Sequence, residues 1–140
     1  AASDVYKRQV KEALPWRQSS YSAYQFLSER TGQYDVILSD LRTSLVVPAF
    51  GGKVVAHKLP LLFIPGYEYD ERLEDVSHFF ASGCTTGERL TIIKKYGVDY
   101  ILVNKEMTTN WEGLVDTLSP YGEIDFENEQ LVLLSLNQAR

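Results

Sequence analysis

Apolar runs without polar alternation predict three buried strands in this chain. Residues 34–40 (YDVILSD) form the first, and residues 98–104 (VDYILVN) form the last, directly after a helical pattern. Between them, residues 51–55 (GGKVV) look like another strand. Strands without a polar face belong to sheets that helices cover on both sides. The chain is therefore predicted to be an α/β protein, a three-layer Rossmann-like sandwich in which these three strands are parallel.

Helical patterns with matching end signals predict the layers that cover the sheet. Ser19 or Ser20 is placed to cap a helix that stops at Gly32. Asp70 is placed to cap a second helix that stops at Gly83. Ser and Asp side chains accept hydrogen bonds from the free N–H groups of a first turn, and glycine adopts the left-handed conformation that ends many helices. Both helices are thus expected to have defined ends.

Two further helices have stronger signals. Thr85 and Glu88 have the spacing of a capping box, which predicts a helix from there to Gly97. Asn110 begins the strongest apolar period in the chain, and Pro120 closes it. The side chains predicted to face the core from these two helices are Leu90, Ile93, Tyr96, Trp111, Leu114, Val115 and Leu118.

The C-terminal part alternates between apolar and polar residues. Residues 124–127 and 130–136 are predicted to form a hairpin around Asn128 and Glu129. The sheet should then have about five strands, mostly parallel, with this antiparallel hairpin at its C-terminal end. Residues 58–69 contain two prolines and are predicted to be a long apolar loop over the edge of the core, with a protein-interaction surface as the alternative.

The composition is that of an ordinary globular domain. The chain has 140 residues, of which 44% are hydrophobic and 24% charged, and it contains no apolar run long enough to span a bilayer. This length fits one domain, which we place at residues 19–140. The net charge of −5 argues against a nucleic-acid partner, which would need clustered Lys and Arg. The single Cys84 excludes an internal disulfide.

The first residues are interpreted separately as a flexible leader, residues 1–18. Residues 3–9 (SDVYKRQ) have no apolar period and resemble the translation of a sequencing adapter from metagenomic reading frames. We exclude them from the fold. Residues 10–18 are interpreted as a linker.

Functional chemistry is expected at the carboxyl ends of the parallel strands, where open α/β sheets bind ligands. Thr43 and Ser44 come where a helix would begin, with Arg42 beside them, so hydroxyls and free N–H groups could bind an anion. The segment lacks the glycine-rich turn of dinucleotide and P-loop sites, and a simple cap by Asp40 or Thr43 is the favoured alternative. The candidate ligand-binding residues at the strand ends are Asp40, Arg42, Thr43, Ser44, His57 and Asn104.

Other chemistry has weaker signals. His57 and His78 have no Cys or His partner at a metal-ligand spacing, so no metal is predicted. Cys84 has no base nearby in the sequence that would make it a nucleophile. The acidic residues at 68–75 are explained by a solvated helix start. Neither a catalytic set nor a cofactor is predicted from these residues.

The order of these segments resembles a known family. The segments that carry the resemblance are YDVILSDLRTSLVVPAFGGKVV, RLEDVSHFF and ERLTIIKKYGVDYILVN, followed by a helix and a closing hairpin. Together they are similar to the globular C-terminal domain that follows the last membrane helix in polytopic GT-C-type glycosyltransferases. These enzymes use polyprenyl-phosphate sugars and include the dolichyl-phosphate-mannose and aminoarabinose transferase families. The resemblance covers residues 19–136 and rests on the fold pattern.

The resemblance implies a non-catalytic accessory domain. In that family the catalytic carboxylate lies in a loop between early membrane helices, so no catalytic residue is transferred to this chain. The domain would lie on the extracytoplasmic face of a bacterial inner membrane as part of a polytopic protein. Its partners would be the membrane-embedded part of the same polypeptide and a glycan or lipid-linked sugar acceptor. Trp16, beside Arg17 in the linker, is typical of a membrane interface.

A second hypothesis comes from the strand ends alone. It describes a free-standing α/β domain that binds a small anionic or sugar-phosphate ligand at residues 40–44. The genomic sequence upstream of Val10 distinguishes the two hypotheses, because several apolar spans there favour the transferase domain and a start codon favours the free-standing one.

Overall fold

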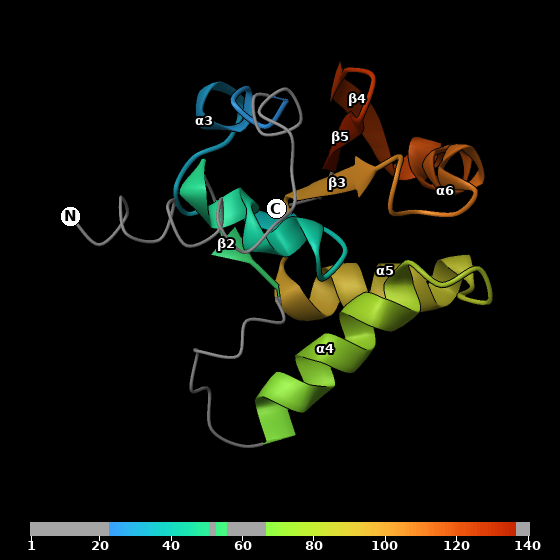
Figure 1. The fold of residues 1–140 in the computed structure, drawn as a ribbon. Coiled ribbons are helices and arrows are strands. Elements are labelled where there is room, and N and C mark those ends of the chain that lie inside the picture. The colour runs from blue at the N-terminus through green and yellow to red at the C-terminus, as the bar shows by residue number, and fades with distance from the viewer. Residues whose placement is uncertain (1–22, 51–52, 56–66, 137–140) are drawn as a thin grey trace.

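The computed structural model describes residues 23–50, 53–55 and 67–136 (Figure 1). The predicted leader, the caps at Ser19 and Ser20, His57 and most of the predicted loop at residues 58–69 lie outside these ranges.

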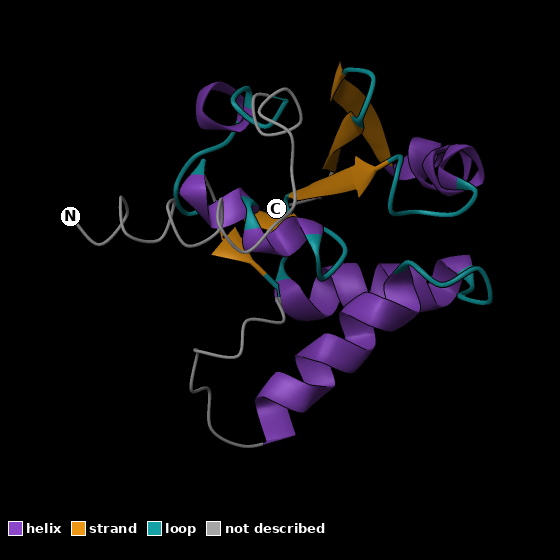
Figure 2. Ribbon diagram, viewed as in Figure 1, coloured by secondary structure: helices purple, strands orange, loops and turns teal. Residues whose placement is uncertain are grey.

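The described residues contain a five-stranded sheet in the order β2-β1-β3-β5-β4. Figure 2 shows its strands in orange and the helices around them in purple. Strand β1 pairs in parallel with both β2 and β3, whereas β5 pairs antiparallel with β3 and with β4. The parallel arrangement of the first three strands and the C-terminal hairpin are confirmed. The sheet is evenly mixed rather than mostly parallel, because the hairpin adds through β5 to the free edge of β3. The strands are β1 (Val36–Leu38), β2 (Lys53–Val54), β3 (Tyr100–Asn104), β4 (Gly122–Glu127) and β5 (Leu131–Leu136).

The helices agree with most of the predicted end signals. The α-helices are α3 (Leu27–Arg30), α4 (Tyr67–Phe79), α5 (Thr86–Tyr96) and α6 (Trp111–Leu118), and the 3-10 turns are η1 (Thr43–Leu45), η2 (Val47–Ala49) and η3 (Ser119–Tyr121). Helix α3 ends at Arg30, two residues before the predicted Gly32. The next residue, Thr31, is extended, and its hydroxyl donates to the Leu27 carbonyl at 2.7 Å. The prediction that Asp70 caps a helix is wrong, because α4 begins at Tyr67. No helix-breaking residue stands between Gly66 and Gly83, so the helix extends back into the predicted loop.

Helix α5 has the predicted capping box. The Glu88 N–H donates to the Thr85 hydroxyl at 3.2 Å, and the Thr85 N–H donates to the Glu88 carboxylate at 3.0 Å. Gly97 ends the helix in the left-handed conformation, with φ of 60°. Both ends of α5 were therefore readable from local sequence.

Apolar side chains are buried on both faces of the sheet. One core lies between the sheet and helices α4, α5 and α6, and includes Val76, Ile93, Ile101, Leu118 and Val132. The other lies beneath α3 and the 3-10 turns and includes Leu27, Val47, Leu102 and Leu133. Alternate residues of β3 belong to the two cores, as the period of a strand requires. The central position predicted for residues 98–103 is confirmed.

Candidate functional site

The predicted site residues at the end of β1 form a capped turn. One carboxylate oxygen of Asp40 accepts the N–H groups of Arg42 and Thr43, at 3.1 and 3.0 Å. The other accepts the Thr43 hydroxyl at 2.6 Å. The Ser39 and Ser44 hydroxyls lie 2.6 Å apart, and the Ser44 hydroxyl also donates to the Ser39 carbonyl. Asp40 therefore stabilises η1, as the alternative interpretation of this segment expected.

The end of β3 joins this turn through Asn104, whose side chain is fully buried. Its amide nitrogen donates to the Thr43 hydroxyl and to the Tyr24 hydroxyl, both at 3.1 Å, and its amide oxygen accepts the Glu106 N–H at 3.0 Å. Burial raises the pKa of Tyr24, which keeps the phenol protonated. Asn104 thus links the end of β3 to η1 and to Tyr24, which lies just before α3.

The predicted ligand-binding residues are brought together only in part. Asp40, Thr43 and Asn104 converge and are linked by side-chain hydrogen bonds, and the hydroxyl of the adjacent Ser44 bonds to Ser39. The Arg42 side chain is exposed and has no hydrogen bond or ion pair among the described residues. Ligand binding at this cluster stays a prediction, and its contacts give it a structural role.

Lys105 directly follows β3, but its side chain is mostly covered by neighbouring residues instead of pointing freely into solvent. Its amine donates to Glu127 at 2.6 Å and to the Asn128 carbonyl at 2.8 Å, and it lies 4.5 Å from the centre of the Trp111 ring. These contacts tie the β3 end to the hairpin and to α6.

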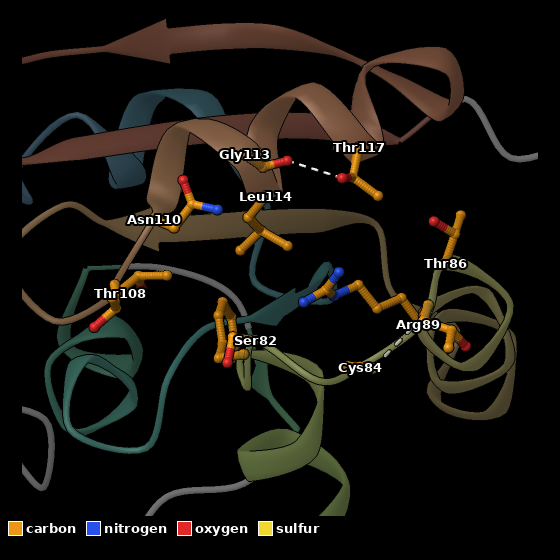
Figure 3. A pocket seen from close by; sticks show the side chains of 12 residues that line it. Ser82, Cys84, Thr86, Arg89, Thr108, Asn110, Gly113, Leu114 and Thr117 are labelled. Carbon is orange, nitrogen blue, oxygen red and sulfur yellow. Dashed lines mark hydrogen bonds between the residues drawn. The ribbon is translucent and has the colours of Figure 1, made fainter.

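A cavity of about 340 Å³ lies between the α4–α5 connection, the first turn of α5, the β3–α6 connection and α6 (Figure 3). Helix α5 leads into β3 through a short turn at residues 97–99 and runs back against it, so its N-terminus lies at the carboxyl end of the strands. This is the end of the sheet where a site was predicted. The polar residues that line the cavity include Ser82, Thr85, Thr86, Arg89, Thr108 and Asn110.

Arg89 supplies the charge in this cavity. Arg89 is 8% exposed, and Figure 3 shows its side chain extending from α5 so that the guanidinium lies below Leu114. Its Nε donates to the Phe79 carbonyl at 2.8 Å and one terminal nitrogen to the Ala81 carbonyl at 3.0 Å. Those carbonyls end α4, where a cation is favoured by the helix dipole. Among the described residues the guanidinium has no carboxylate partner.

Two residues of the β3–α6 connection complete the lining. Thr108 is 5% exposed, and its buried hydroxyl has no hydrogen-bond partner in the described part of the chain. Asn110 adopts the left-handed conformation, with φ of 56°, and its side chain makes no capping hydrogen bond. That amide lies over the first turn of α6, where a Cβ on Gly113 would come within 2.4 Å of it. Asn110 therefore precedes α6 as the sequence predicts, but its side chain does not cap the helix.

His78, Cys84 and Glu88 form a cluster at the outer side of α5 that the sequence analysis missed. One ligand atom from each lies within 4.8 Å of the others. His78 Nε2 lies 2.8 Å from a Glu88 oxygen, and the hydrogen bond from the Thr85 backbone, then that ion pair, lowers the pKa of Glu88 to about 2. Burial raises the pKa of the Cys84 thiol. The capping box was the available signal, since it fixes where Glu88 points.

We assign no metal to this cluster. Both Glu88 oxygens and the Nε2 of His78 already hold hydrogen bonds, and a raised pKa disfavours the thiolate that binds metals. The prediction of no metal stays a prediction.

None of the helices in the described part of the chain combines the length and the apolar character needed to cross a bilayer.

One solved structure is similar over most of this chain. It is the C-terminal globular domain of an oligosaccharyltransferase from Archaeoglobus fulgidus, with a TM-score of 0.57. The match covers 89% of this chain and 100% of that domain, at 12% sequence identity. No protein-family model and no curated protein matches the chain. At such low identity the likeness shows a shared fold, that of a globular domain found at the C-terminus of a sugar-transferring enzyme.

Proposed function

We propose that this chain is a non-catalytic accessory domain of a bacterial membrane glycosyltransferase. The observation that carries the proposal is the likeness of fold to an oligosaccharyltransferase domain that the chain covers completely. It agrees with the resemblance of residues 19–136 to the C-terminal domains of GT-C-type enzymes, which rests on the order of the sequence segments. The three parallel strands with helical segments on both faces support the Rossmann-like description of this domain.

The state of the reactive side chains supports an accessory role. The Cys84 thiol lies near His78, but that imidazole is bonded to Glu88 and the thiol donates to the Thr85 carbonyl at 3.6 Å. A nucleophile of this kind needs a base that is free to take its proton. Two of the described carboxylates also have structural contacts. Asp40 caps a turn, and Asp75 accepts hydrogen bonds from Lys95 and from the Tyr96 hydroxyl.

The finer proposal concerns place and partners. The domain would stand on the extracytoplasmic face of the inner membrane, attached to the membrane-embedded part of its own polypeptide. There it would help to dock a glycan or lipid-linked acceptor, or support the membrane helices. The donor would be a polyprenyl-phosphate sugar, as in the dolichyl-phosphate-mannose and aminoarabinose transferase families.

The test compares the domain with the polypeptide that contains it. The purified chain should transfer no sugar from any polyprenyl-linked donor. The same polypeptide with its preceding membrane region should transfer it, and deletion of residues 19–140 should reduce that activity. Turnover by the isolated chain that a single carboxylate substitution abolishes would overturn the proposal, as would an upstream reading frame without membrane spans.

A further inference from the structure

A nearly buried guanidinium faces the cavity between α5 and α6 without an acidic partner. The Arg89 side chain is 8% exposed, and two of its nitrogens bond to the carbonyls of Phe79 and Ala81. A guanidinium has five N–H donors, so its remaining terminal nitrogen is without a partner among the described residues. Buried charges in proteins are normally paired. The end of α4 offsets part of this charge and leaves unused donors beside the cavity.

The other cavity walls also present donors. Thr85 and Thr86 begin α5, an 11-residue helix whose N-terminal N–H groups carry a partial positive charge. The Thr108 hydroxyl is buried and unsatisfied, although buried polar groups almost always have a partner. Ser82 adds an exposed hydroxyl to the cavity lining (Figure 3). The cavity wall therefore brings together the Arg89 guanidinium, the N-terminus of α5 and residues of the α4–α5 and β3–α6 connections.

The charge in this space differs from that of the whole chain. The chain has 19 acidic and 14 basic residues, yet the described residues that line the cavity include no acidic side chain. The acidic residue closest to it in sequence, Glu88, is held by Thr85 and His78. A positive, hydroxyl-rich cavity in an acidic protein selects an anion.

From this geometry we propose that the cavity binds the phosphate group of a small polar ligand, with Arg89 and the α5 N-terminus as its anchors. Phosphate has acceptor oxygens in several directions, which matches donors that come from α5, the α4–α5 connection and the β3–α6 connection, and arginine is suited to phosphate geometry. The volume of about 340 Å³ lies at the lower end of the range for ligand pockets, which leaves room for a polar group beyond the phosphate. This inference does not depend on the proposed function, because it rests only on contacts within the chain.

The test is a titration of the isotopically labelled chain with inorganic phosphate, pyrophosphate and acetate, each followed by amide NMR shifts at constant ionic strength set with chloride. Phosphate and pyrophosphate should shift the amides of Thr86, Gly87 and Thr109 and saturate. Acetate should bind more weakly, because it offers fewer acceptors. Shifts that are absent with phosphate, or that fall mainly on other parts of the chain, would overturn the inference. Acetate binding as tight as pyrophosphate binding would overturn the assignment to phosphate.

A matched pair of variants identifies the cavity as the site. Ser82→Glu places a carboxylate at the exposed wall of the cavity, whereas Ser82→Gln adds nearly the same volume without charge. Ser82→Glu should weaken pyrophosphate binding by about tenfold or more, and Ser82→Gln should change it by less than about threefold. Equal effects of the two variants would mean that charge in this cavity does not determine binding.

Arg89→Lys provides a second, independent test. It keeps the positive charge but removes the fork that bonds the α4 carbonyls and the ligand, so binding should weaken even where thermal unfolding shows that the chain still folds. If Arg89→Lys proves too unstable to purify, the Ser82 pair decides the question, since neither Ser82 variant removes a hydrogen bond of the fold. A folded Arg89→Lys chain with unchanged affinity would contradict the role of the guanidinium.

Discussion

Replacing Leu102 by alanine tests the central position of β3. Leu102 is fully buried in the core beneath the 3-10 turns, and it lies opposite Leu133 of β5. The substitution removes three carbon atoms, worth about 2.4 kcal/mol at roughly 0.8 kcal/mol per carbon. The space left behind adds to this loss, because strands β1 and β5 on either side prevent collapse. We therefore expect the free energy of unfolding to fall by about 3–5 kcal/mol, a large part of the stability of a small domain.

Urea unfolding followed by circular dichroism measures this change. The midpoint should fall while the slope with denaturant stays that of the unsubstituted chain, which separates lost stability from a changed unfolded state. Arg42→Ala is the control, because this exposed side chain has no contact that the substitution would remove, and its effect should stay below about 0.5 kcal/mol. If Leu102→Ala were as mild as Arg42→Ala, the central position of β3 would have to be abandoned.

Four further outcomes are expected. Asp40→Ala should cost about 1–2 kcal/mol in urea unfolding, because Asp40 holds η1; a change near zero with lost ligand affinity would instead assign it to binding. Lys105→Ala should cost about 1 kcal/mol by the same measurement, through its lost contacts with Glu127 and Trp111, and an effect as small as that of a free surface lysine would contradict them. Gly97→Ala should lower the melting temperature because of its positive φ, whereas Ala at Gly87, in open space within a helix, should not. Glu88 has its pKa lowered from 4.5 to about 2, so its contribution is complete above about pH 4.5 and is lost as pH falls toward 2; the melting-temperature difference from Glu88→Gln should shrink over that range, and a constant difference would argue against the ion pair.

Local sequence determined the elements whose ends depend on nearby groups. The capping box of α5 and its left-handed Gly97 are both set by residues within a few positions of one another. The apolar run of β3 and the alternation of the hairpin likewise identified their strands. Asp70 failed as a cap because helix propensity continued through it to Tyr67, and a side chain that can cap does so only if the helix begins there.

Tertiary structure decided which of these elements are neighbours. The order of strands, with β5 between β3 and β4, depends on which free edge of the sheet the hairpin pairs with. The alternation of apolar and polar residues within the hairpin does not identify that edge. The candidate site at Asp40 and Thr43 was readable as a polar cluster, but its role depends on Asn104, which arrives from more than 60 positions away. The sequence alone favoured capping over binding, and the contact with Asn104 shows how the capped turn is joined to the end of β3.

The cavity at α5 was beyond the reach of sequence reasoning for the same reason. Arg89 reads as an ordinary charged position on an amphipathic helix, and Thr108 as part of a polar connection. Only the assembled fold buries both residues, and among the described residues it leaves the Arg89 guanidinium without a carboxylate partner and the Thr108 hydroxyl without a hydrogen-bond partner. Sequence patterns indicate which residues of one helix or strand are buried. Whether a buried polar group finds a hydrogen-bond partner depends on the neighbouring elements, and therefore on the tertiary arrangement.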